Sequence, residues 1–127
     1  MKTILVDAAK AFVVNGKVDE DLHNLLETYD NPKVILTNAN DEQLVEFGIV
    51  DMPYEVFTLK HDPNKTDPEY YKTFLDEYSL DPSDVIYFEH SQEAVESAKS
   101  LGIATFFYDP NNKDLSALKE FLDSNLE

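Results

Sequence analysis

Six polar residues of the chain have side chains of the kinds that carry phosphate chemistry: Asp7, Thr37, Asn38, Lys65, Glu89 and His90. A carboxylate such as Asp7 can attack phosphorus, and a hydroxyl and an ammonium group can hold phosphate oxygens. A second carboxylate can bind a divalent metal. The chain therefore holds the minimal set for phosphoryl transfer through an aspartyl intermediate, provided that the fold brings these residues together.

Each of these residues also has a purely structural explanation. Asp7 could cap the turn that follows its strand, and Thr37 with Asn38 could cap the next helix. Lys65 could be a solvated surface lysine. His90 could be a polar rim or capping residue rather than a metal ligand or a base. The positions in the fold must decide between these alternatives.

Short apolar runs rich in β-branched residues predict five strands, at residues 3–8, 33–38, 54–59, 84–89 and 104–108. The runs at 4–6 and 34–36 are apolar without interruption, which favours strands buried on both faces, as in a parallel sheet.

Amphipathic stretches between the strands predict helices at residues 19–29, 40–47, 67–78, 92–101 and 114–125. Thr66 and Glu69 have the spacing of a capping box before the third of these, and Asn15-Gly16 predicts a small hairpin over 12–18. Strands that alternate with helices predict a single α/β domain over residues 1–127. We expect a three-layer, doubly wound (Rossmann-like) fold around a parallel five-stranded sheet.

The predicted strands place the polar residues at one edge of that sheet. Asp7 ends the first strand, Thr37 and Asn38 end the second, and Glu89 and His90 follow the fourth. Ligands of open parallel sheets bind at the carboxyl ends of the strands. We therefore expect the candidate site at this edge, with Lys65 entering from the segment before the 67–78 helix.

The composition excludes several classes of function. The net charge of −16 argues against binding to nucleic acid or to anionic membranes, which needs clustered cations. All basic residues are lysines, so a phosphate group cannot be held by an arginine fork. The chain has no cysteine, and no leader segment is recognisable, so a cytoplasmic location is expected.

Four segments resemble, in the correct order, the motifs of the haloacid dehalogenase (HAD) superfamily. They are residues 4–7 (Ile-Leu-Val-Asp), 34–38 (Val-Ile-Leu-Thr-Asn), 65–71 (Lys-Thr-Asp-Pro-Glu-Tyr-Tyr) and 85–91 (Val-Ile-Tyr-Phe-Glu-His-Ser). The resemblance implies that Asp7 is a catalytic nucleophile. It also implies that Thr37 and Lys65 take part in catalysis, and that Thr37, Asn38 and Lys65 bind the phosphorylated substrate. The Asn15-Gly16 hairpin lies where the family places its flap.

The resemblance also implies a metal cofactor, Mg²⁺ or Mn²⁺, held by Asp7, the backbone carbonyl of Ala9 and Glu89. Two departures from the family pattern concern this part of the site. Ala9 replaces the second aspartate, which protonates the leaving group and later activates water, and loss of such a group costs about 10²–10⁴-fold in rate. Glu89 and His90 stand where the family has one or two aspartates, and a histidine ligand would favour manganese or zinc.

The segments from Asp7 to Thr37 and from Thr37 to Lys65 are too short to hold the cap domain that many relatives carry. A site without a cap is open to water. It would act on a large substrate, or be covered by a second copy of the chain or by a protein partner.

Two functions fit these features. The first is a metal-dependent HAD-type phosphatase that uses Asp7 as nucleophile and has impaired acid–base catalysis. The second is a non-catalytic relative that binds a ligand or a protein. A phosphorylated receiver domain fits less well, because its reactive aspartate follows the third strand and the third strand here ends without an acid.

Overall fold

The computed structural model describes residues 1–126, so Glu127, the last residue of the expected domain, lies outside it. The strands of the main sheet are β1 (Thr3–Asp7), β4 (Lys33–Thr37), β5 (Glu55–Thr58), β6 (Val85–Glu89) and β7 (Ala104–Phe107). They pair in the order β5-β4-β1-β6-β7, and every pair is parallel. The predicted parallel five-stranded sheet is confirmed, with each strand within one or two residues of its expected bounds.

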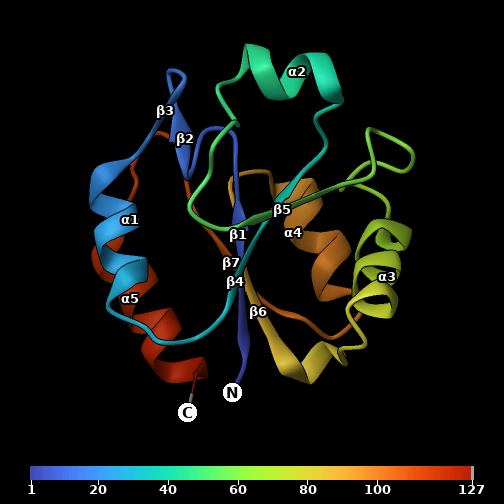
Figure 1. The fold of residues 1–127 in the computed structure, drawn as a ribbon. Helices are drawn as coiled ribbons and strands as arrows, with labels where there is room; N and C mark the ends of the chain where they lie inside the picture. Colours follow the sequence, from blue (N-terminus) through green and yellow to red (C-terminus); the bar gives the residue numbers. More distant parts are fainter. Residues whose placement is uncertain (127) are drawn as a thin grey trace.

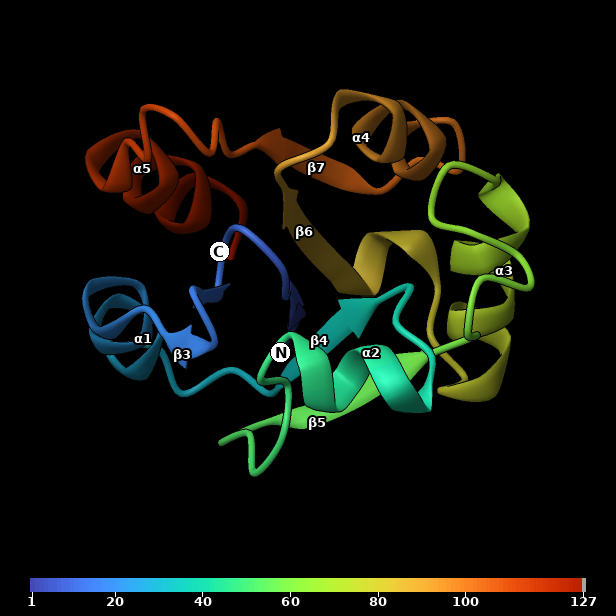
Figure 2. The ribbon, with the colours of Figure 1, turned by 90° about the horizontal axis from the view of Figure 1, so that it is seen from above.

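The helices are α1 (Glu20–Glu27), α2 (Asp41–Glu46), α3 (Pro68–Glu77), α4 (Gln92–Lys99) and α5 (Leu115–Asn125), with a 3-10 turn, η1 (Pro82–Asp84), before β6. Figure 1 shows α1 and α5 on one side of the sheet and α3 and α4 on the other, and the view from above in Figure 2 shows the same three layers. The shorter α2 lies beyond the carboxyl ends of the strands.

Two hydrophobic cores fill the space between the layers. Side chains of a strand alternate between its faces, so Ile4 and Val6 join the core under α1 and α5. Leu5 joins the core under α3 and α4. The second core is rich in aromatic residues, and its central Phe74 packs against Phe57 at a ring-centroid distance of 5.1 Å. The strands are therefore buried on both faces, as their unbroken apolar runs predict.

The expected capping box at the start of α3 is wrong. The helix begins one residue later than that pattern requires, and its N-cap is Asp67, whose side chain accepts a hydrogen bond from the Glu69 N–H. Aspartate is a stronger N-cap than threonine, and Pro68 then fits the first helical position.

A small hairpin, β2 (Val13–Val14) and β3 (Lys17–Val18), follows β1 as predicted. Its turn residues Asn15 and Gly16 have φ of 53° and 77°. The tip rests on the loop after α2, because a Cβ on Gly48 would lie 2.5 Å from the Gly16 carbonyl oxygen. The hairpin, called the flap below, and α2 are thus held together by a backbone contact that only glycine allows.

The connections across the site edge are short. Between β1 and β4 the structure has only the flap and α1, and between β4 and β5 it has only α2. No cap domain is therefore inserted in residues 1–126. Within the same range, no helix is long and apolar enough to cross a membrane.

Replacing Phe74 with alanine should lower the free energy of unfolding by about 3–5 kcal/mol, because it leaves a cavity among packed rings. Phe74 is fully buried in the α3–α4 core. Chemical denaturation followed by circular dichroism measures the change. Val45→Ala, at a residue that is 71% exposed, is the control and should change stability by less than about 0.5 kcal/mol. Equal effects of the two substitutions would contradict this core assignment.

Candidate active site at the carboxyl edge of the sheet

Asp7 and Glu89 end the neighbouring strands β1 and β6, and both side chains point to the same face. They share the strand face of Leu5 and Tyr87, which lies against α3 and α4. Asp7 is 1% exposed and Glu89 is fully buried. Two carboxylates placed side by side in this way need positive charges close by, because an unpaired buried charge is strongly unfavourable.

Lys65 supplies the first positive charge. Its Nζ lies 2.8 Å from Asp7 Oδ1 and 2.8 Å from Glu89 Oε1, and it donates a third hydrogen bond, of 3.1 Å, to the Leu36 carbonyl. The three protons of the ammonium group are thus all used. Lys65 is 5% exposed, so the alternative of a solvated surface lysine is excluded.

Asn38 positions Lys65 through the backbone. Its side-chain oxygen accepts a 2.7 Å hydrogen bond from the Lys65 N–H, which ties the segment before α3 to the end of β4. Asn40, not Asn38, caps α2, so the alternative that Thr37 and Asn38 cap this helix is excluded. A direct contact between Asn38 and a substrate stays a prediction.

His90 approaches the two carboxylates from the other side. Its backbone N–H donates to Asp7 Oδ2 at 2.9 Å, and its ring Nδ1 also contacts that oxygen. The same Nδ1 lies 3.1 Å from Glu89 Oε2. His90 therefore bridges Asp7 and Glu89 and is not a plain rim residue.

Two further donors complete the surroundings of Glu89. The Tyr87 hydroxyl donates to Oε1, and the Ser91 N–H donates to Oε2 at 3.0 Å. Reasoning from the sequence missed Tyr87, although it stands two residues before Glu89 and so shares its strand face. Asp7 Oδ1 accepts from Lys65, and Glu89 Oε2 accepts from the Ser91 N–H.

Burial and the neighbouring charges shift the pKa values of the two carboxylic acids in opposite directions, down for Glu89 and up for Asp7. Burial raises the pKa of Glu89, but the ammonium of Lys65 and the other donors outweigh burial and hold the pKa well below its ordinary value. Burial and the negative charge of Glu89 raise the pKa of Asp7, and Lys65 and His90 limit that rise. Glu89 thus keeps its negative charge, and Asp7 is the more basic of the two carboxylates.

The two bases are both held in the charged form. Burial lowers the pKa of Lys65, but Asp7 and Glu89 outweigh it and raise the pKa well above the ordinary value. Burial likewise lowers the pKa of His90, and hydrogen bonds to Asp7 and Glu89 raise it to about 9. Two anions and two cations therefore form a neutral, buried cluster.

Thr37 ends β4, the strand that pairs with β1, and is 5% exposed. Its Oγ1 accepts a 3.2 Å hydrogen bond from the Ala39 N–H, which leaves the hydroxyl proton free to be donated. Tyr70 fixes the backbone at this point, because its hydroxyl donates to the Thr37 carbonyl at 2.8 Å. The contact of Thr37 with a substrate phosphate, which the resemblance implies, stays a prediction.

Two hollows flank the segment that follows Asp7. One, of about 450 Å³, lies between the flap and α2 and is lined by Ala9, Lys10, Val13, Asn15, Gly16, Glu46 and Phe47. The other, of about 350 Å³, lies between the flap and the β7–α5 loop and is lined by Lys10, Val14, Pro110, Asn111 and Lys113. Ala9 stands at the first hollow, two residues from Asp7, so this hollow is the nearer opening to the candidate site.

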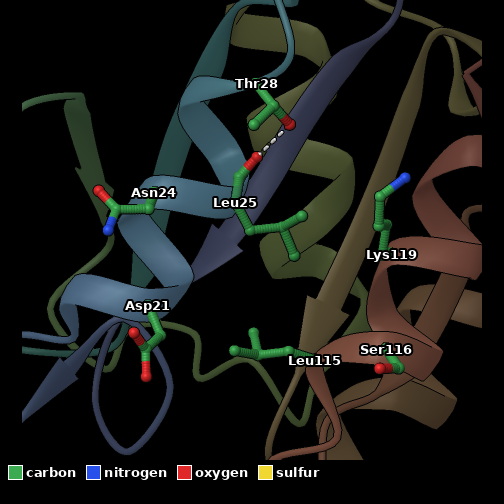
Figure 3. Close-up of a pocket in the computed structure, with 7 residues that line it drawn as sticks. All are labelled: Asp21, Asn24, Leu25, Thr28, Leu115, Ser116 and Lys119. Carbon is green, nitrogen blue, oxygen red and sulfur yellow. Dashed lines mark hydrogen bonds between the residues drawn. The ribbon is translucent and has the colours of Figure 1, made fainter.

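A groove of about 440 Å³ between α1 and α5 is separate from this edge. Figure 3 shows that its lining residues come from the two helices, with the Thr28 hydroxyl bonded to the Leu25 carbonyl. The groove holds none of the residues singled out in the sequence, and it is not the candidate site.

No protein-family model and no curated protein matches the chain, but solved structures do. A HAD-family enzyme from Bacteroides thetaiotaomicron, an aspartate-to-alanine mutant in complex with magnesium and inorganic phosphate, aligns with a TM-score of 0.70 at 14% identity. The alignment covers 93% of this chain and 98% of that one. This chain has the HAD-like fold.

Two further structures agree. A HAD-superfamily hydrolase of subfamily IA from Geobacter sulfurreducens PCA aligns with a TM-score of 0.65 at 12% identity, over 85% of this chain and 87% of that one. A protein of unknown function from Corynebacterium glutamicum aligns with a TM-score of 0.64 at 20% identity, over 97% and 96% of the two chains. The HAD-like fold therefore extends over nearly the whole chain.

The fold family implies a divalent metal, and the donor set here can be compared with that need. Carboxylate oxygens of Asp7 and Glu89 and the His90 nitrogen all lie within 4.8 Å of one another. Asp7 Oδ2, however, already accepts from both the backbone and the ring of His90. With His90 in this position, no lone pair of that oxygen is left for an ion, so the residues as arranged do not fit a divalent metal.

Replacing Lys65 with methionine should lower the free energy of unfolding by about 3–5 kcal/mol, because it removes the cation from a buried ion pair. The loss should shrink as the pH falls toward about 4, since protonation of Asp7 or Glu89 then removes the repulsion between them. Denaturation curves at several pH values measure both effects.

The matched control is Lys60→Met, because Lys60 forms a 3.1 Å ion pair with Asp41 at the surface. Exposed pairs contribute at most about 1 kcal/mol. Glu89→Gln in the Lys65→Met background should restore part of the stability by removing one of the two anions. A loss at Lys65 no larger than that at Lys60 would show that the buried cluster is not the anchor described here.

Proposed function

We propose that this chain is a HAD-like phosphohydrolase in which Asp7 attacks the phosphorus of a phosphate monoester. The observation that carries the proposal is the buried cluster itself, in which the Lys65 ammonium lies 2.8 Å from Asp7 Oδ1. Asp7 and Lys65 come from separate segments and meet at the carboxyl edge of the sheet, where α/β folds bind ligands. Thr37 ends the neighbouring strand β4.

The phosphate group is held by donors that already surround Asp7. A dianionic phosphate competes with the carboxylates for the protons of Lys65, and the Thr37 hydroxyl donates its free proton to a second phosphate oxygen. The charge on the phosphate thus takes over part of the pairing that the cluster makes without a ligand. No arginine is needed for this arrangement, in keeping with the composition of the chain.

The Asp7 carboxylate is the attacking group, and Lys65 holds it in place. As the bond from one of its oxygens to phosphorus forms, the ester P–O bond breaks and the leaving oxygen takes the electron pair. Water then attacks the aspartyl phosphate, releases inorganic phosphate and restores the Asp7 carboxylate.

Ala9 determines which substrates can react. It offers no proton to the leaving oxygen and no base to the attacking water, and such a group contributes about 10²–10⁴-fold. Substrates whose leaving group is a stable anion, such as a phenolate, need the acid least. The hollow beside Ala9 includes the half-exposed Phe47 ring, which offers an apolar surface to an aryl group.

The resemblance implies Mg²⁺ or Mn²⁺ held by Asp7, the Ala9 carbonyl and Glu89. This cofactor is not part of the proposal, because His90 occupies the carboxylate oxygens that the ion would need, and none of the steps above uses it. The site has no cap, so a large phosphorylated substrate, a second copy of the chain or a protein partner would have to cover it. A cytoplasmic location stays an expectation from the sequence.

A non-catalytic binding role is the second candidate, and one observation favours it. Each carboxylate oxygen of Asp7 and Glu89 already has a protein donor, so the cluster is stable without a ligand. In that case the edge would bind an anion through Thr37 and Lys65 without turnover. The assays below separate the two functions.

The purified chain should hydrolyse an activated aryl phosphate such as p-nitrophenyl phosphate, and Asp7→Asn should abolish the reaction. The amide keeps the size of the side chain but is a far weaker nucleophile. Release of the phenolate, measured with Mg²⁺, with Mn²⁺ and with a chelator, gives the rate. Activity that persists in Asp7→Asn would show a contaminant, and its complete absence in the unaltered chain would favour the binding role.

Ala9→Asp should raise the rate on a simple alkyl phosphate by up to about 10²–10⁴-fold, because it restores a proton donor near the leaving oxygen. The gain on the aryl phosphate should be smaller, since that leaving group needs no proton. Release of inorganic phosphate measures both rates. Lys10→Asp, at the neighbouring exposed position, adds an acid to the same segment without burying it and should give no gain. Equal gains on both substrates would argue against missing acid catalysis at Ala9.

A further inference from the structure

The two carboxylates of the site are bridged twice, once from each side. On the inner side, Lys65 Nζ joins Asp7 Oδ1 to Glu89 Oε1, with both distances 2.8 Å. On the outer side, His90 Nδ1 joins Asp7 Oδ2 to Glu89 Oε2. The outer pair of oxygens is the pair that a shared divalent ion would use, because the inner pair is committed to the buried lysine.

The outer carboxylate oxygens have few lone pairs left that could bind an ion. Asp7 Oδ2 accepts from the His90 backbone and ring, and Glu89 Oε2 accepts from the Ser91 N–H and lies 3.1 Å from the His90 ring Nδ1. A carboxylate oxygen has two lone pairs. An ion could bind there only after the His90 ring had moved away.

The ring is also oriented as a donor. A histidine that binds a metal does so through a nitrogen lone pair. Here Nδ1 faces two carboxylate oxygens, which can only accept hydrogen bonds, so Nδ1 carries the proton. That orientation holds for the neutral ring and for the imidazolium alike, and neither form offers Nδ1 as a ligand.

We propose that the His90 ring is a built-in substitute for the divalent ion, bridging Asp7 and Glu89 and closing the site to metals for as long as it stays there. The charge balance agrees, because two carboxylates with Lys65 and a charged His90 are already neutral. The inference rests on the proposed function for the assignment of Asp7 as the reacting residue. It departs from the metal dependence that the fold family implies.

The proposal predicts that removing the ring creates a metal site. Mn²⁺ is the probe, because both carboxylates and imidazole bind it and because free Mn²⁺ is counted directly by electron paramagnetic resonance. After treatment with a chelator, the unaltered chain should bind no stoichiometric Mn²⁺. His90→Ala should bind one ion with an affinity at least about 10-fold higher, and its melting temperature should rise with added Mn²⁺.

Two controls make the result specific. Glu89→Gln in the His90→Ala background should remove the new binding, which separates it from loose cation binding by a chain of net charge −16. His23→Ala removes a histidine on α1 that packs against Phe12 and Tyr54, away from the cluster, and should behave like the unaltered chain. His90→Asn is a second variant in case His90→Ala does not fold.

Stoichiometric Mn²⁺ binding by the unaltered chain that weakens in His90→Ala would overturn the proposal and make His90 a ligand. Folded variants that bind no better than the unaltered chain would overturn it as well. If both variants fail to fold, Mn²⁺ broadening of the Asp7 and His90 amide signals of the unaltered chain would overturn it, and intact signals would support it. The readout is metal binding and not turnover, so a chain without phosphatase activity leaves this result unaffected.

Discussion

The Lys65 ammonium group is the interaction on which the candidate site depends. Asp7 and Glu89 end adjacent parallel strands and face the same side of the sheet, so the backbone alone would place two buried anions next to each other. Such a pair cannot stay charged without a cation within hydrogen-bond distance. Lys65 meets this need because Asn38 fixes its backbone at 2.7 Å and the Leu36 carbonyl accepts its remaining proton.

His90 balances the remaining charge and gives the site its particular character. With Lys65 on the inner side and His90 on the outer side, the cluster is neutral and each carboxylate oxygen has a donor. A ligand must therefore compete with existing hydrogen bonds, which favours a group of high negative charge such as a phosphate dianion. Because each carboxylate oxygen already has a donor, the cluster is stable without a ligand.

The surroundings of the cluster determine what can reach it. The flap and α2 meet where a Cβ on Gly48 would lie 2.5 Å from the Gly16 carbonyl oxygen. Gly16 and Ala9 both line the hollow between these two elements. No cap domain is inserted among residues 1–126 to cover this edge of the sheet.

The sequence by itself determined the fold class, the parallel sheet, the approximate position of each element and the strand-end placement of Asp7, Thr37 and Glu89. These follow from hydrophobic periodicity, a local property that each segment carries within itself. Only the tertiary structure decided that Asp67, not Thr66, caps α3, that Asn38 holds Lys65, and that Tyr87 and His90 complete the cluster. The Asn38–Lys65 and His90–Asp7 contacts join segments 27 and 83 residues apart in the sequence, and the Asp67 cap and the Tyr87 contact depend on where helix α3 and the end of β6 lie in the folded chain. At a strand end the alternation of faces no longer fixes their direction, so it is the packing of loops and helices that sets which donor reaches which oxygen.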